Sequence, residues 1–201
     1  IPAEAFFADV VFLVEGTSEI LFYKALAKSC ENIDLDRQNI SILSVEGVSF
    51  KIYVQILEAL EIKWVFRTDN DISKIPRQDN KYQFAGINRC LAVYKEFFRD
   101  SNSFNELITI KESLLSNFEG ELPPKLNIDA AKEFIEFLKE YNMFLSDKDL
   151  ESDLLLSEIK PVLIEFFSIS DEEKILVEMR KKKAIFMYSF LNEHSQIVCV
   201  T

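Results

Sequence analysis

Three short apolar segments in the first 70 residues have the length and composition of buried strands. They cover residues 10–14, 40–45 and 63–68 and are rich in β-branched and aromatic side chains. Between them, residues 17–33 and 49–62 carry apolar side chains at helical spacing, and Thr17 or Ser18 and then Ser49 are suited to cap these helices. The alternation predicts an α/β fold, with a parallel sheet flanked by helices and right-handed crossovers.

The pattern changes after the third predicted strand. Residues 72–83 are polar and contain Pro76, whereas residues 87–99, 104–118 and 130–141 each have a helical pattern. We therefore predict a helical insertion over residues 76–141, between a first part of the α/β core (1–75) and its remainder (142–201). In that remainder we expect a returning strand at 143–146. Helices should follow at 154–167 with a bend at Pro161, at 171–179, and at 184–191 packed against the sheet.

Acidic residues follow the predicted strands. Glu15-Gly16 ends the first, Glu46-Gly47 the second and Asp69-Asn70-Asp71 the third, and the returning segment carries Asp147, Asp149 and Glu151. Carboxyl ends of parallel strands meet at one edge of a sheet, where ligands bind, and Glu19 lies one helical turn beyond Glu15. Carboxylate oxygens suit Mg²⁺ or Mn²⁺, and two such ions about 4 Å apart can clamp a phosphoryl group.

Each acid also has a simpler explanation. A carboxylate after a strand favours the positive end of the next helix, and a surface acid is often only solvated. For Asp147 and for the acids of the insertion this explanation has at least equal weight, whereas coincidence explains the strand-end group less well.

Composition narrows the remaining possibilities. The chain is 48% hydrophobic and 28% charged, which predicts a globular protein without a membrane span. Its three cysteines are widely spaced and it has one histidine, so we expect a reducing cytoplasm, no disulfide framework and no zinc or Ser-His-Asp chemistry. The net charge of −11 argues against a general nucleic-acid-binding face, unless bound cations reverse the charge that a phosphate meets.

The order of these motifs carries a family resemblance. Glu15-Gly16 after the first strand and Asp69-x-Asp71 after the third resemble the TOPRIM domain, which topoisomerases, primases and certain nucleases share. The wider pattern is similar to the C-terminal region of OLD-family (overcoming lysogenisation defect) endonucleases. It consists of a Val14-Glu15-Gly16 opening with Glu19, an insertion after Asp71, Asp149-Leu150-Glu151, and a lysine before the last helix.

The resemblance implies a metal-dependent DNA endonuclease or nickase with a two-metal mechanism. The implied ligands of two Mg²⁺ or Mn²⁺ ions are Glu15, Glu19, Asp69, Asp71, Asp149 and Glu151, and the implied catalytic residues are Glu15 and Lys183. Lys181 and Lys182 compete for the role of the lysine, and the basic run at 180–183 is also explained by a solvated helix start or a patch for DNA phosphates.

The resemblance also implies partners. Relatives join this region to an N-terminal ABC-type ATPase, and the chain contains no Walker A pattern, so we expect the C-terminal part of a larger, cytoplasmic, homo-oligomeric protein. Gabija-type anti-phage nucleases share this layout, which suggests a helicase-like defence partner.

Two other classes of function fit part of the pattern. A receiver-like signalling module also places acids after its first and third strands, but the insertion and the second acid of Asp69-x-Asp71 fit it poorly. A non-catalytic TOPRIM scaffold is disfavoured because the expected acids are all present. DxD-type phosphatases rank lower, since they place their pair after the first strand.

Overall fold

The fold is organised around one parallel sheet. The computed structural model describes residues 3–30, 32–46, 49–98 and 112–194. Its four-stranded sheet has the order β2-β1-β3-β7, with β1 at Val10–Val14, β2 at Ile40–Ser44, β3 at Lys63–Thr68 and β7 at Met143–Leu145. All adjacent strands are parallel, and Val10 of β1 lies opposite both Ile40 and Lys63. The predicted α/β class and all four predicted strands are confirmed.

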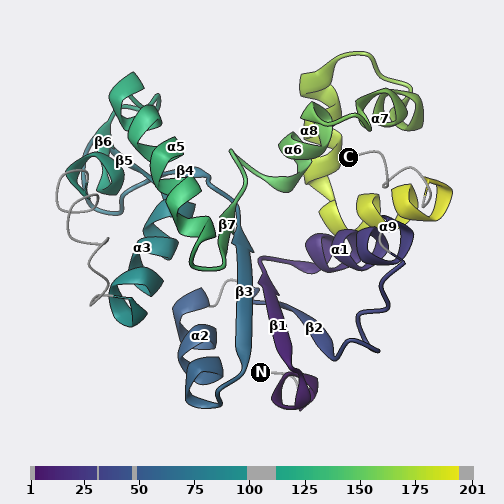
Figure 1. The fold of residues 1–201 in the computed structure, drawn as a ribbon. Helices are drawn as coiled ribbons and strands as arrows, with labels where there is room; N and C mark the ends of the chain where they lie inside the picture. The colour runs from purple at the N-terminus through teal and green to yellow at the C-terminus, as the bar shows by residue number, and fades with distance from the viewer. Residues whose placement is uncertain (1–2, 31, 47–48, 99–111, 195–201) are drawn as a thin grey trace.

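Helices cover both faces of this sheet (Figure 1). A short 3-10 helix at Ala3–Phe7 precedes β1. One face carries α2 (Phe50–Ala59), α3 (Ala85–Phe97) and α5 (Lys125–Lys139). The other side carries α1 (Thr17–Cys30), α6 (Leu150–Leu156), α7 (Lys160–Phe167), α8 (Glu172–Lys181) and α9 (Lys183–His194). Among the described helices, none combines the length and apolar character needed to cross a membrane.

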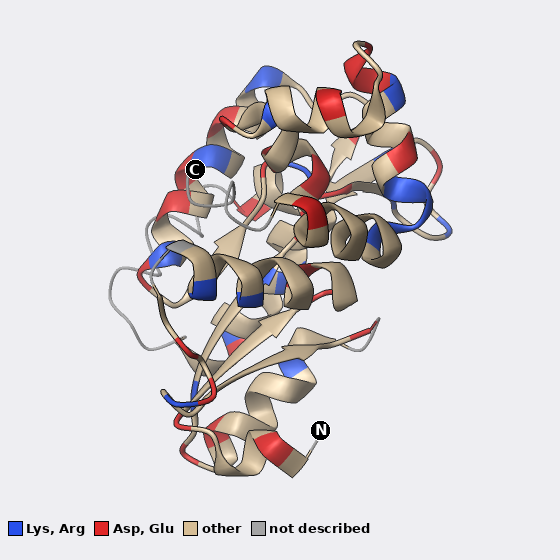
Figure 2. Ribbon diagram, turned by 90° about the vertical axis from the view of Figure 1, so that its right-hand side faces the viewer, with Lys and Arg blue, Asp and Glu red and all other residues tan. Residues whose placement is uncertain are grey.

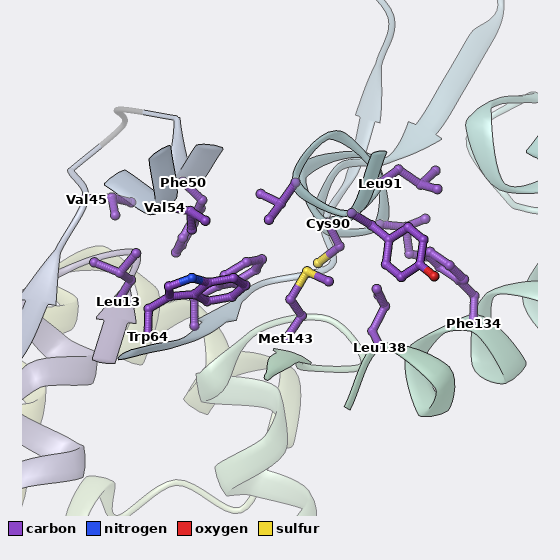
Figure 3. Close-up of a cluster of buried hydrophobic side chains, with 14 of the residues drawn as sticks. Leu13, Val45, Phe50, Val54, Trp64, Cys90, Leu91, Phe134, Leu138 and Met143 are labelled. Carbon is purple, nitrogen blue, oxygen red and sulfur yellow. The ribbon is translucent and has the colours of Figure 1, made fainter. Parts of the chain in front are cut away.

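The larger hydrophobic core joins the sheet to the predicted insertion. Side chains of β1, α2, β3, α3, α5 and β7 meet in one buried cluster (Figure 3). In it Trp64 stacks on Phe66 with ring centroids 5.9 Å apart, and Cys90 of α3 and Met143 of β7 are fully buried. The first helices of the insertion thus stabilise the sheet directly. The boundaries at 76 and 141 stay a prediction.

A second core lies on the other side of the sheet. Phe22 of α1 packs with buried residues of α6 to α9, among them Ile159 and Met187. We expected the last helix to pack against the sheet, but α9 contacts mainly α1 and α8. The reason is that α1 already covers this part of the sheet, as shown by the edge-to-face contact between Phe12 of β1 and Tyr23 of α1.

The prediction of a polar connection at residues 72–83 is wrong. This segment forms β4 (Ile72–Lys74) and β5 (Lys81–Phe84), which pair in antiparallel fashion, and β6 (Phe118–Glu119) completes a small sheet. Arg77 and Asn80 take positive φ angles in the intervening turn. The alternation of Lys81-Tyr82-Gln83-Phe84 is too short and too polar to stand out as a strand.

Two predicted helices also differ. Most of the one expected at 104–118 lies outside the described residues, but residues 112–116 are helical and Phe118 belongs to β6. The bent helix at 154–167 is two helices, because Pro161 lies at the start of α7 and its ring cannot continue a preceding helix. The Ser157 hydroxyl closes the end of α6 by donating to Leu154 O at 2.7 Å.

Gly86 fixes the position of α3 beneath the end of β3. A Cβ added to Gly86 would lie 2.3 Å from Asp69 O and 3.1 Å from Asn70 Cα. Nearby, Ala85 N donates to Asp71 O at 2.8 Å and Ile87 N donates to Asn70 Oδ1 at 3.3 Å. The start of α3 therefore rests against the backbone of Asp69-Asn70-Asp71, and only glycine allows this approach.

We predict that Gly86→Ala destabilises the protein by about 1–3 kcal/mol, although alanine is the better helix former, because the backbone atoms it meets cannot rotate away. Chemical denaturation measures the effect. Gly16→Ala is the matched control, since its Cβ would meet only Glu19 Oε2, at 3.4 Å. Equal stability of the two variants would contradict the proposed packing role of Gly86.

Candidate active site

Glu15 joins the ends of the two central strands. It follows β1, and its Oε1 accepts hydrogen bonds from the Thr68 hydroxyl at the end of β3 and from Asp69 N at 2.8 Å. The parallel pairing of β1 with β3 makes this contact possible. Glu15 and Asp69 are therefore brought together as predicted from the strand ends.

Arg89 reaches the same carboxylate from α3. Its Nη1 donates to Glu15 Oε1, to Thr68 Oγ1 at 2.6 Å and to Asp69 O at 3.2 Å. Both side chains of the ion pair keep some exposure, 36% for Arg89 and 27% for Glu15. Sequence reasoning missed Arg89, because it stands within a helical pattern and belongs to no motif that we used.

Lys183 meets two acids from the opposite side. Its Nζ lies 2.8 Å from Glu151 Oε2 and 3.7 Å from Asp69 Oδ2, and the two carboxylates have side-chain exposures of 0% and 5%. The acids Glu15, Glu19, Asp69, Asp71 and Glu151 are called the acidic group below. Of the three competing lysines, the structure places Lys183 beside acids of this group, whereas Lys181 pairs with Glu178 and Lys182 is exposed. The Lys183 side chain comes from the first residue of α9.

The buried acids are poorly satisfied. Asp69 Oδ1 and both oxygens of Glu151 accept no well-directed hydrogen bond from the described residues, even though Lys183 lies close to Glu151. Burial, and then the negative charge of Glu15, raises the pKa of Asp69 to about 7. Burial also raises the pKa of Glu151, against the opposing effect of Lys183. Buried polar atoms without partners are rare in stable proteins and commonly mark functional sites.

Glu19 and Asp71 complete the group in different ways. Glu19 is buried on the first turn of α1, where the Ser18 hydroxyl donates to its Oε2 at 2.8 Å. Asp71 is exposed and lines a surface pocket of about 510 Å³ together with Tyr82, Asp147 and Lys148. The alternation in Asp69-x-Asp71 thus gives one buried and one accessible carboxylate.

Asp149 is already occupied by other contacts. It caps α6 by accepting from Ser152 N at 2.9 Å, and Arg180 donates to both of its oxygens at 2.7 and 3.0 Å. Although burial opposes ionisation, these bonds from Arg180 and Ser152 lower the pKa of Asp149 to about 2. In this structure Asp149 holds α6 to α8, and its assignment as a metal ligand stays a prediction. No sequence pattern indicates that Asp149 pairs with Arg180.

The acidic group suits a divalent cation without forming a finished site. Among the described side chains, no three His, Cys, Asp or Glu converge closely enough to hold a metal ion. Arg89 and Lys183 instead pair with Glu15 and Glu151 separately. The unpartnered oxygens of Asp69 and Glu151 are nevertheless hard donors in a buried setting, which is the chemistry that Mg²⁺ and Mn²⁺ prefer.

Comparisons with known proteins identify relatives of this chain. The chain is 31% identical over 198 residues to "Endonuclease GajA" of Bacillus cereus (strain VD045), covering 98% of this chain and 33% of that protein. A second "Endonuclease GajA", from strain HuB5-5, is 29% identical over 111 residues, 52% of this chain and 16% of that protein. The chain therefore spans a third or less of the length of these curated relatives.

Solved structures show the same fold. The C-terminal region of the Burkholderia pseudomallei OLD protein superposes with a TM-score of 0.58 and 19% identity, covering 96% of this chain and 86% of that one. The C-terminal region of the Xanthomonas campestris pv. campestris OLD protein gives 0.53 and 24%, covering 98% and 83%.

A family model connects the sequence to this fold. Residues 6–71, from before β1 to the second acid of Asp69-x-Asp71, match the model described as "Overcoming lysogenization defect protein-like, TOPRIM domain". These residues contain β1, β2 and β3 and the carboxylates that follow them. Residues 6–71 of the chain are therefore similar to the TOPRIM domain of OLD-family proteins.

Proposed function

We propose that this chain is the nuclease domain of a larger protein and hydrolyses DNA phosphodiester bonds with the help of divalent metal ions. The observation that carries the proposal is that Asp69 Oδ1 and both oxygens of Glu151 are buried without a well-directed hydrogen bond from the described residues. Lys183 lies close to both acids, and Asp69 adjoins Glu15. The name "Endonuclease GajA" of the relatives supports the reaction class.

The oxygen donors of this acidic group have the chemistry that two Mg²⁺ or Mn²⁺ ions require. Glu15, Glu19, Asp69, Asp71 and Glu151 would supply oxygen ligands, and Asp149 would keep Glu151 in place by capping α6. Bound there, the ions would activate water and neutralise charge on the phosphate. Lys183 offsets negative charge beside Asp69 and Glu151, while Thr68 and Asp69 N orient Glu15. Because much of the group is buried, these charges act in a low-dielectric setting.

The receiver-like alternative agrees less well with the structure. A phosphoryl-accepting aspartate must meet its phosphate donor, but Asp69 after β3 is 4% exposed and lies against Lys183 and Glu15. Asp71 is accessible, yet it follows the strand by two further residues. A non-catalytic scaffold would have no need for unpartnered buried carboxylates, which cost stability.

The larger assembly is part of the proposal. Since the chain covers 33% of one GajA relative, we propose that an N-terminal ABC-type ATPase region accompanies it in a homo-oligomeric, cytoplasmic protein. We also propose an antiviral setting with a helicase-like partner, as the resemblance to Gabija-type nucleases implies. In the view of Figure 2, basic and acidic segments are intermixed over the molecule, so we expect metal ions or other regions to assist DNA binding.

The first prediction concerns cleavage. Asp69→Asn and Glu15→Gln should each reduce Mn²⁺-dependent nicking of supercoiled plasmid by roughly 100-fold or more, because each removes a ligand charge. Asp129→Asn, an exposed acid on α5, is the matched control and should keep its activity within about twofold. Nicking that persists unchanged in both site variants would rule out the proposed function.

The second prediction concerns the lysine. Lys183→Ala should abolish nicking, whereas Lys182→Ala should retain it, because only Lys183 approaches Asp69 and Glu151. Thermal unfolding must accompany the assay, since removal of Lys183 leaves the Glu151 carboxylate buried and unpaired. The reverse order of activities in two folded variants would assign the catalytic role to Lys182.

The third prediction concerns stability without metal. The pKa of Asp69 rises from 3.8 to about 7 on folding, so the folded chain retains a proton that the unfolded chain releases, and stability falls as the pH rises through this interval. In EDTA, Asp69→Asn should therefore unfold at a higher temperature than the wild type at pH 8, but not at pH 4.

Mn²⁺ should reverse the order of the unfolding temperatures of Asp69→Asn and the wild type at pH 8. Mn²⁺ at 100 times its Kd should stabilise the wild type by roughly 2.7 kcal/mol, and Asp69→Asn by much less. Calorimetry with and without Mn²⁺ measures both effects. Equal stabilisation of the two proteins would show that Asp69 takes no part in metal binding.

A further inference from the structure

Arg89 and Lys183 each pair with an acid of the group, but their surroundings differ. Lys183 pairs with Glu151, whose side chain is fully buried and accepts no well-directed hydrogen bond from the described part of the chain. Arg89 pairs with Glu15, whose Oε1 also accepts from Thr68 and from Asp69 N, so this carboxylate remains held when the arginine leaves. Of the two ion pairs, the one with Arg89 can therefore be exchanged at the lower cost.

The Arg89 contact also uses one oxygen of the carboxylate that would bind a metal ion. All three contacts that Arg89 makes with described residues use Nη1, and the carboxylate contact is to Oε1 of Glu15. A divalent cation bound to Glu15 would compete with this guanidinium for the same negative charge and would repel it. Binding of a metal ion to Glu15 and pairing of Arg89 with Glu15 therefore weaken each other.

The position of Arg89 is nevertheless fixed. Its helix α3 is held against Asp69-Asn70-Asp71 by the close approach of Gly86 to the backbone and by the hydrogen bond from Ile87 N to the side-chain Oδ1 of Asn70. An arginine displaced from Glu15 would thus stay beside the metal site. Since it is 36% exposed, it could meet a substrate there, and guanidinium groups bind phosphate oxygens well.

We propose that Arg89 is an exchangeable counter-ion, which pairs with Glu15 in the metal-free site and turns to a phosphate oxygen of the DNA when Glu15 binds metal. This inference rests on the proposed nuclease function and adds a DNA-binding residue to it. It explains why a cation from the insertion touches the first acid of the site. It also makes the first insertion helix part of substrate recognition.

Metal binding gives the first test. Calorimetric titration with Mn²⁺, in the absence of DNA, should show a severalfold tighter Kd for Arg89→Gln than for the wild type, because the competing cation is gone. The same variant should nick plasmid at least tenfold more slowly, mainly through a higher KM for DNA. Arg37→Gln, at an exposed site beyond the opposite ends of the strands, should change neither value.

The direction of the change in metal affinity distinguishes this role of Arg89 from a structural one. An arginine that only orients Glu15 would give weaker metal binding in Arg89→Gln, and that result would overturn the proposal. Arg89→Lys keeps the charge and should retain the wild-type metal affinity. Failure of the wild type itself to bind Mn²⁺ or cut DNA would contradict the proposed function instead.

DNA binding in EDTA gives a second test that needs no cleavage, and its main comparison leaves Arg89 unchanged. Fluorescence anisotropy at low salt should show severalfold tighter DNA binding for Glu15→Gln than for Glu19→Gln. Both variants remove one negative charge, but only the first releases Arg89. The double variant Glu15→Gln/Arg89→Gln should lose the difference. Equal DNA affinities of Glu15→Gln and Glu19→Gln would contradict the proposed exchange of Arg89 between Glu15 and a DNA phosphate.

Discussion

The parallel pairing of β1 with β3 is the interaction on which the candidate site depends. It sets Leu13 opposite Phe66, so that Glu15 meets the Thr68 hydroxyl and Asp69 N two residues farther along. A shift of one residue would turn every side chain of the strand to the other face. Buried Val11, Leu13 and Phe66 oppose such a shift, since their burial depends on the register. The hydrophobic core thereby determines which carboxylates meet.

The two faces of the sheet supply the two cations of the site. The larger core holds α3, in which Cys90 and Tyr94 are buried, and so presents Arg89. The second core holds α9 through Met187 and Phe190 and presents Lys183 at its first residue. Neither cation comes from a strand, although the acids they contact follow the strands or begin α6. The site is therefore complete only when both helical layers are in place, which couples its geometry to the folding of the whole domain.

Sequence patterns predicted the strands and most of the acids, because buried strands and their ends have strong local signatures. Glu15 and Asp69 needed only the assumption of a parallel sheet to be placed together. Arg89, Gly86 and the Asp149–Arg180 pair could not be found in this way, since each acts through a contact with a residue distant in sequence. The hairpin of β4 and β5 escaped notice because its strands have three and four residues and largely polar side chains.

The arrangement of charge explains why the group is not simply structural. A protein selected only for stability would pair Asp69 and Glu151 fully or replace them by apolar residues, because a buried carboxylate without partners costs free energy. Here Lys183 approaches both acids without satisfying their oxygens. Arg89 neutralises Glu15, which already accepts hydrogen bonds from two other donors. Among the described contacts, Arg89 makes none with the carboxylates of Asp69 and Glu151. With this distribution of charge the acids lie close together, and their negative charge is only partly neutralised. A divalent cation can relieve this repulsion with its higher charge, at the point where the carboxyl ends of β1 and β3 meet.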